Sequence, residues 1–105
     1  MITLTTATIP GKEISEALGI VRGSTVRARN FGRDIFASLK NLIGGEISEY
    51  TQLQGQARDE ALARMVEEAK EMGADAIVNI RFATSTITQG ASEILAYGTA
   101  VKLKS

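Results

Sequence analysis

Four arginines in one short stretch have the residue type and the spacing that anion binding needs. They are Arg22, Arg27, Arg29 and Arg33. A guanidinium group presents forked donors that match phosphate or carboxylate oxygens. Arg27 and Arg29 fall on one face of a predicted strand, and Arg33 opens a predicted helix whose N-terminus favours anions. We therefore take these four residues as a candidate site for a small anion or a nucleotide.

The distribution of charge offers an alternative reading of the same arginines. Residues 1–45 carry a balance of +3, whereas residues 46–75 carry a balance of −5. These two zones can pair with each other, within one chain or between subunits. The whole chain is neutral, with twelve basic and twelve acidic residues, so neither a nucleic acid nor a membrane is an expected partner.

The sequence contains few residues of the types that bind metals or catalyse reactions. The chain has no Cys and no His, which removes the usual soft-metal ligands and the commonest general base. Met65 and Met72 lie on the apolar stripe of a predicted helix, where core packing is expected. The acidic residues are spread around that helix and do not converge as ligands of a cation would. The sequence offers no nucleophile with an activating base, and it has no glycine-rich phosphate-binding loop. We expect no metal site, no cofactor and no enzymatic activity.

The elements that must position these residues read as strand, strand, helix, helix, strand, strand. An alternating pattern predicts strands at 2–7, 20–27, 75–88 and 92–104, and residues 13–17 read as a loop or a helical turn. Gly23 marks a bulge or a close backbone approach. Helices are expected at 31–43, after an Asn30 cap, and at 48–72, ended by Gly73. The chain is thus one α+β domain, 1–105, with an antiparallel sheet packed by two helices.

The last two strands suggest how the sheet is covered. In strand 75–88 the pattern places Ala76, Val78, Ile80 and Phe82 on one face. Strand 92–104 has two mainly apolar or small faces, so helices should cover one of them and a neighbouring subunit the other. Turn residues 89–90 join the two strands as a hairpin. The candidate subunit interface is the face formed by Ile94, Ala96, Gly98 and Ala100.

Several segments together resemble the YbjQ-like family of “putative heavy-metal-binding” proteins. They are Arg33-Asp34-Ile35-Phe36-Ala37, Ile43-Gly44-Gly45, Tyr50, Gly73-Ala74-Asp75-Ala76-Ile77-Val78 and Gly98-Thr99-Ala100-Val101. The resemblance implies a dodecin-like α+β fold, a ring-shaped homo-oligomer that is a pentamer, and a cytoplasmic protein without established activity. Asn79 and Arg81 stand where many members of the family carry acidic residues, which removes candidate oxygen ligands.

Two hypotheses about function follow. The first is a non-enzymatic module that forms a ring-like homo-oligomer and binds a partner or a small ligand between its subunits. The alternative is a protein that binds a metal or a small anion, as the family description suggests. The N-terminus lacks a basic and apolar leader pattern, and no apolar run approaches the length of a membrane span, so the expected location is the cytoplasm.

Overall fold

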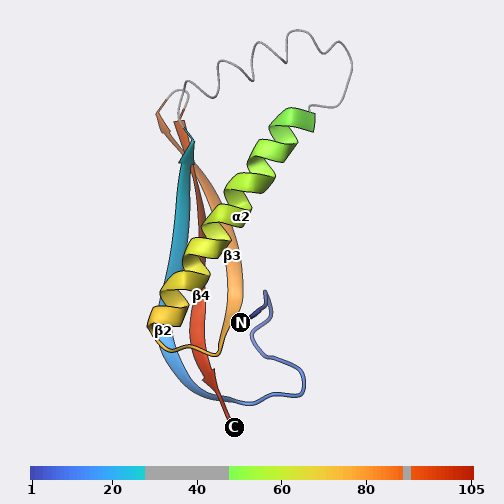
Figure 1. The fold of residues 1–105 in the computed structure, drawn as a ribbon, viewed down its shortest axis with the longest axis vertical. Helices are drawn as coiled ribbons and strands as arrows, with labels where there is room; N and C mark the ends of the chain where they lie inside the picture. The colour runs from blue at the N-terminus through green and yellow to red at the C-terminus, as the bar shows by residue number, and fades with distance from the viewer. Residues whose placement is uncertain (28–47, 89–90) are drawn as a thin grey trace.

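Four strands form one mixed sheet in the computed structural model, which describes residues 1–27, 48–88 and 91–105. The strands are β1 (Ile2–Thr3), β2 (Ile14–Arg27), β3 (Ala76–Thr88) and β4 (Ala91–Leu103), in the spatial order β1-β3-β4-β2 (Figure 1). The pairs β2–β4 and β3–β4 are antiparallel, whereas β1 runs parallel to β3. The expected α+β class is therefore confirmed, but the sheet is mixed and not purely antiparallel as predicted.

The N-terminal part of the chain differs from the prediction at two places. Strand β1 ends at Thr3, and beyond it the backbone continues irregularly, with the N–H of Leu4 donating to Ile77 O at 2.9 Å. Strand β2 begins at Ile14, so the loop or helical turn expected at 13–17 is wrong. Register shifts between Ile14 and Glu16 and between Ala17 and Gly19 interrupt the alternation there, which explains why the pattern did not read as a strand.

Helix α2 (Ser48–Glu71) matches the prediction closely at both ends. Its C-terminus is closed by Gly73, which has a φ of 78°. The N–H of Gly73 donates to Lys70 O and the N–H of Ala74 donates to Ala69 O, each at 3.0 Å, which is the Schellman pattern. The helix expected at 31–43 lies outside the described residues. The described part of the chain thus contains one helix where two were predicted for the whole.

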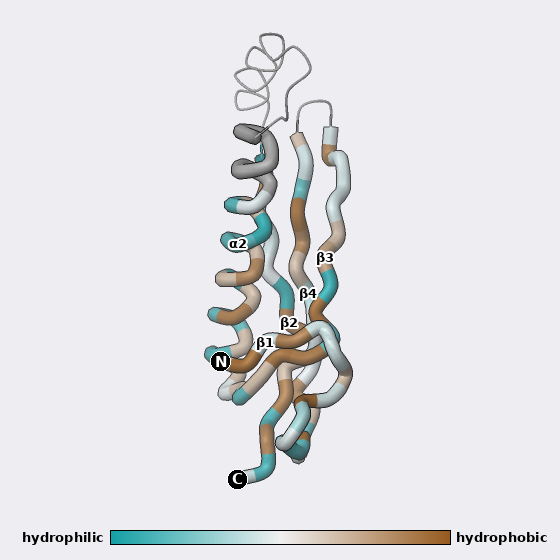
Figure 2. Tube along the Cα trace, turned by 90° about the vertical axis from the view of Figure 1, so that its right-hand side faces the viewer, coloured by the Kyte–Doolittle hydropathy of each residue, from teal (hydrophilic) through white to brown (hydrophobic). Residues whose placement is uncertain are grey.

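The two faces of the sheet carry separate cores. We call the face beneath α2 the helix face, where Val21, Ala61, Met65 and Ile77 are fully buried. On the opposite face, which we call the open face, Ile9, Ala76, Val78 and Val101 form a second core under the N-terminal segment (Figures 1 and 2). That second core occupies one end of the sheet only.

A bulge in β3 overturns the predicted face of that strand. Asn79 has a φ of 55°, and the register with β4 shifts between Val78 and Arg81. The extra residue exchanges the faces, so that Ile77 and Ile80 pack with α2 while Ala76 and Val78 pack on the open face. The predicted common face of Ala76, Val78, Ile80 and Phe82 is therefore wrong.

The two faces of β4 alternate as predicted. Ile94, Ala96 and Ala100 are buried in the core beneath α2. Gly98 lies between them and is packed so closely that an added Cβ would come within 2.9 Å of Ile77 Cγ2. A helix of the same chain thus buries the face that the sequence analysis assigned to a subunit contact, and this burial requires no second copy.

Candidate functional site

Helix α2 and strand β2 approach each other closely at Gly23. A Cβ added at Gly23 would overlap Ala61 O and Met65 N, and it would come within 2.8 Å of Arg64 Cβ. The small side chains of Ala57 and Ala61 make this approach possible on the helix side. Gly23 was predicted to mark a bulge or a close backbone approach, and the structure shows the close approach.

Hydrogen bonds and ion pairs join α2 and β2 beside this contact. Arg27 Nη2 donates to Glu60 Oε2 at 3.0 Å, and Arg64 Nη2 lies 3.8 Å from Glu60 Oε1. Arg64 Nη1 donates to the backbone oxygen of Ser24, while the buried Thr25 hydroxyl donates to Ala57 O at 3.0 Å. Arg27 belongs to the basic zone and Glu60 to the acidic zone, so the predicted pairing of the zones occurs within the chain at this point.

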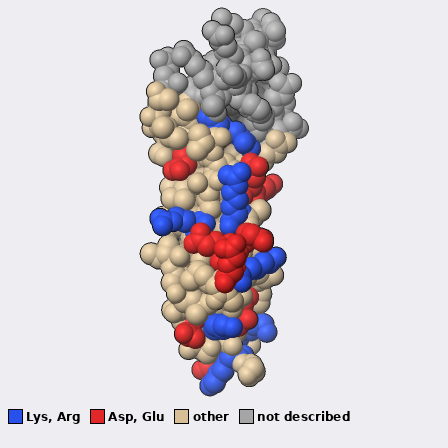
Figure 3. Space-filling model, turned by 60° about the vertical axis from the view of Figure 1, so that its left-hand side comes forward, with Lys and Arg blue, Asp and Glu red and all other residues tan. Residues whose placement is uncertain are grey.

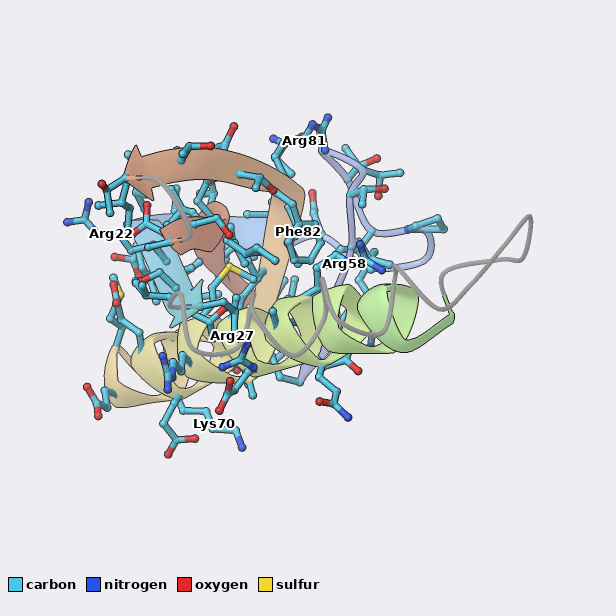
Figure 4. The ribbon with its side chains drawn as sticks, turned by 90° about the horizontal axis from the view of Figure 1, so that it is seen from above. Arg22, Arg27, Arg58, Lys70, Arg81 and Phe82 are labelled. Carbon is cyan, nitrogen blue, oxygen red and sulfur yellow. The ribbon has the colours of Figure 1, made fainter. Side chains whose placement is uncertain are left out.

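The structure does not bring the candidate anion-binding arginines together where it describes them. Arg22 lies opposite Tyr97 in the register of β2 and β4, on the open face, whereas Arg27 lies on the helix face beside Glu60 (Figure 4). Arg29 and Arg33 lie outside the described residues. The side chains of Arg22 and Arg27 therefore do not converge on one ligand within a single chain.

The acidic side chains that the structure describes are dispersed. No group of three or more Asp or Glu residues within 1–27, 48–88 and 91–105 is arranged to hold a metal ion. Asp75 Oδ2 instead accepts the N–H of Leu103 at 2.8 Å, and Glu13 pairs with Lys104 at 3.2 Å. Figure 3 shows acidic and basic side chains lying next to each other along one face of the molecule.

The two internal methionines differ in their surroundings. Met65 of α2 is fully buried against the sheet, as predicted. Met72 follows the end of the helix and is 38% exposed, so the prediction of core packing is wrong for this residue. Its position lies over β2, where a Cβ added at Gly19 would be 3.8 Å from Met72 Cε.

Arg81 has a role that sequence reasoning missed. Its Nη1 donates to Thr5 O at 2.9 Å and to Ile80 O at 2.8 Å, which ties the N-terminal segment to β3 next to the bulge. The N–H of Asn79 donates to Thr6 O at 3.0 Å in the same place. Asn79 was the signal in the sequence for the bulge at this point, because Asn adopts a positive φ more readily than the apolar residues around it.

Exposed apolar side chains gather on the two outer long strands. Large apolar residues are exposed at Ile20 (75%) and Val26 (52%) of β2 and at Phe82 (45%) and Ile87 (58%) of β3. Tyr97 of β4 is 39% exposed and lies on the open face next to Arg22. Figure 2 shows apolar positions along the strands beyond the part that the N-terminal segment covers. We call these five residues the apolar set. Ile20, Val26 and Tyr97 lie on the open face, whereas Phe82 pairs with Ala96 on the helix face, so the set is defined by exposure and not by a sequence pattern.

Comparison with known proteins gives consistent results over nearly the whole chain. A family model with the description “Putative heavy-metal-binding” matches residues 1–104. A UPF0145 protein of Archaeoglobus fulgidus is 58% identical over 104 residues, covering 99% of this chain and 96% of that protein. A UPF0145 protein of Vibrio parahaemolyticus is 59% identical over 103 residues, covering 98% of each chain.

One solved structure supports the fold. A protein of unknown function of the DUF74 family, from Pediococcus pentosaceus, superimposes with a TM-score of 0.66. The match covers 99% of this chain and 98% of that protein, at 18% sequence identity. In the described residues, no helix combines the length and the apolar character needed to cross a membrane.

Proposed function

The chain belongs to the YbjQ-like family, and from this premise we propose that it is a non-enzymatic module that assembles with copies of itself into a ring. Five copies is the number that the family resemblance implies. A ligand or partner of the module would then bind between subunits. The carrying observation is the apolar set, Ile20, Val26, Phe82, Ile87 and Tyr97, which one chain leaves exposed.

The size of this exposure supports the proposal. Large apolar side chains scattered singly on a surface are ordinary, but Ile20, Val26 and Tyr97 share the open face of two paired strands, and Phe82 and Ile87 lie on the strand at the other edge of the sheet. Burying them against another copy removes apolar surface from water at about 25 cal/mol per Å². The two most exposed of them, Ile20 and Ile87, lie on different outer strands, so two separate surfaces of each chain gain from contact.

The total accessible surface of the chain also supports assembly. A compact monomer of 11.2 kDa exposes about 5,700 Å². This chain exposes 7082 Å², and its principal extents are 55 × 25 × 16 Å. An elongated chain of this kind buries less of its own apolar surface than a compact one, and association with further copies offsets that deficit.

A non-enzymatic role agrees with the chemistry of the described residues. The chain supplies no His and no Cys. Of its described arginines, Arg27, Arg64 and Arg81 bond to carboxylates or backbone oxygens, Arg22 lies on the open face, and Arg58 is exposed on α2. Arg22 is the one described arginine of the predicted anion site that faces the apolar set. It is therefore the residue that we expect to contribute charge to a subunit contact or to a ligand bound there.

The molecular mass of the native protein tests this proposal. We expect sedimentation equilibrium and light scattering at micromolar concentration to give a multiple of the chain mass. Ile20→Lys should reduce the assembled fraction, because it places a charge in an apolar contact, while Ala63→Lys on the exposed side of α2 should leave it unchanged. A mass of one chain for the unmodified protein would overturn the proposal.

Metal binding is the alternative function, and the family description is the observation that favours it. Repeating the mass measurement with and without Zn²⁺ and Cu²⁺ separates the two. Assembly that is independent of added metal supports the module that we propose. Assembly that appears only with metal, at a fixed ratio of metal to chain, would favour the alternative.

A further inference from the structure

Both lateral edges of the sheet are open over most of their length in the described chain. Strand β1 covers only Ala76 and Ile77 of β3, and Leu4 and Thr6 accept the N–H groups of Ile80 and Asn79. Beyond these residues β3 continues through Phe82–Thr88, which we call the distal β3 segment. On the other side of the sheet, β2 is the last strand, and no described strand pairs with its outer edge.

The distal β3 segment lacks the charges and prolines that often protect a sheet edge, and its one irregularity in the register with β4 lies near its end, between Thr86 and Thr88. It contains no charged residue, no proline and no glycine, and three of its seven positions are threonine (84, 86 and 88). Every residue of it is exposed in the single chain, including Phe82 and Ile87. An extended, uncharged and β-branched strand with a free edge is a template for pairing with another strand. The segment therefore offers an edge that a partner strand can extend.

The stretch Ile20–Arg27 of β2 has the complementary properties. Its register with β4 is regular, because both shifts of β2 lie before Ile20. Ile20 and Val26 are exposed at its two ends. Arg64 donates to Ser24 O, so this one carbonyl of the stretch has a partner within the chain.

Strand direction and charge decide which edges meet. Strands β2 and β3 are both antiparallel to β4, so they run in the same direction at opposite edges of the sheet. A rotation that brings β3 of one copy to β2 of the next gives a parallel pair and leaves a free β2 and a free β3 for further copies. Such a head-to-tail contact forms a ring when the rotation closes and a filament when it does not. Pairing of two β2 edges would instead bring the basic side chain of Arg22 close to its own counterpart.

We propose that the distal β3 segment of one copy adds as a parallel strand to the outer edge of Ile20–Arg27 in the neighbouring copy. This inference rests on the assembly proposed above and names the surfaces that form it. The sheet then runs from subunit to subunit. Ile20 and Val26 of the apolar set then lie along this junction on the open face, and Phe82 lies along it on the helix face.

Cysteine cross-linking tests the junction against a clean background, since the chain has no cysteine. Ser24 and Ser85 lie opposite Leu95 and Glu93 of β4, so both are on the open face and can meet across a β2–β3 junction. We would oxidise the double variant Ser24→Cys/Ser85→Cys, with Ser24→Cys/Ala83→Cys and Arg22→Cys/Ser85→Cys covering neighbouring registers. In at least one of them we expect most of the protein to shift to covalent multimers on a non-reducing gel.

The controls separate this inference from the assembly itself. Each single-cysteine variant should remain uncross-linked, as should Ser24→Cys/Thr8→Cys, whose second thiol lies in the N-terminal segment. Dimers from Ser85→Cys alone would mean that two β3 edges meet and would overturn the head-to-tail arrangement. An oligomeric mass without cross-links in any of the three double variants would overturn the junction but not the assembly. A monomeric mass would overturn both.

A second variant keeps the inference testable if disulfides form poorly. Ile87→Lys places a charge in the distal β3 segment at a position that is 58% exposed in the chain, so the fold should survive. We expect a loss of the assembled fraction at unchanged circular dichroism, with Ala63→Lys as the control for added charge. An unchanged mass for Ile87→Lys would overturn the role of this segment.

Discussion

Gly23 of β2 lies directly beneath Ala61 of α2, so close that a Cβ on the glycine would overlap the carbonyl oxygen of the alanine. The helix therefore rests on the strand backbone, with no side chain between them at this point. This relationship fixes the separation of the two layers. It also fixes where Glu60 and Arg64, which flank Ala61 in the helix, meet Arg27 and Ser24 of the strand.

Gly23→Ala should therefore destabilise the fold. The new methyl group meets helix backbone, which cannot move aside as a flexible side chain can, and we expect a loss of at least about 2 kcal/mol of unfolding free energy. Urea unfolding followed by circular dichroism measures it. Gly55→Ala is the matched control, because only Arg58 Nη2 lies as near as 4.0 Å and an alanine inside a helix should add about 0.5–1 kcal/mol. Equal effects at the two glycines would contradict this account.

Asn79 should tolerate glycine but not a β-branched residue. Its φ of 55° is open to glycine and asparagine, whereas valine there costs about 1–3 kcal/mol. We expect the unfolding free energy of Asn79→Gly to lie within about 0.5 kcal/mol of that of the natural protein. Asn79→Val should unfold at a clearly lower denaturant concentration. If Asn79→Val were as stable as Asn79→Gly, the bulge would not be required for β3 to change faces.

How far the sequence predicts this structure depends on whether local alternation continues unbroken. The helix at 48–72 was predictable because Ala57, Ala61, Met65 and Ala69 recur at helical spacing and Gly73 ends them. The faces of β3 were not predictable from alternation, because one residue in a positive-φ conformation at Asn79 exchanges all later positions. Likewise, two bulges within 14–19 hid the beginning of β2.

The candidate sites show the same division. Arg22 and Arg27 are an odd number of residues apart on one strand, so simple alternation already places them on opposite faces. The sequence could not show which face of β4 packs under the helix, because both faces consist mainly of apolar or small residues. Only the packing of α2 shows that Ile94, Ala96 and Ala100 belong to the core of their own chain. The members of the apolar set come from three strands, and their exposure depends on the order of the strands in the sheet, which a local sequence pattern does not show.

Ala96→Glu distinguishes a core position from an interface position. Ala96 is completely buried beneath α2, so a carboxylate there has neither water nor a partner, and we expect a loss of several kcal/mol and an unfolded or strongly destabilised chain. Thermal unfolding by circular dichroism measures this. Ile20→Lys, on an exposed site, should keep the fold. A well-folded Ala96→Glu protein with a reduced mass would instead place this face at a subunit contact.

The last prediction is that the protein has no high-affinity site of its own for a heavy metal, although its family carries that description. Cys and His are absent, so the ligands that select Zn²⁺, Cu²⁺ or Cd²⁺ over Mg²⁺ are missing. Met65 is buried among apolar side chains, and Arg81 places a positive charge beside the bulge where the family resemblance implies acidic residues. Any cation would then depend on Asp and Glu residues brought together between subunits, at a dissociation constant of roughly millimolar order.

Calorimetric titration of the tag-free, metal-free protein with Zn²⁺, Cu²⁺ and Cd²⁺ measures this directly, and we expect no heat of binding at micromolar metal. The double variant Ala63→His/Glu67→His is the matched control. It places two imidazoles four residues apart on the exposed side of α2, a spacing that binds Zn²⁺ and Cu²⁺, and it should give a clear signal under the same conditions. Micromolar binding by the natural sequence, at a fixed ratio per chain or per assembly, would contradict the prediction, because oxygen ligands alone would then have to supply an affinity that normally requires nitrogen or sulfur.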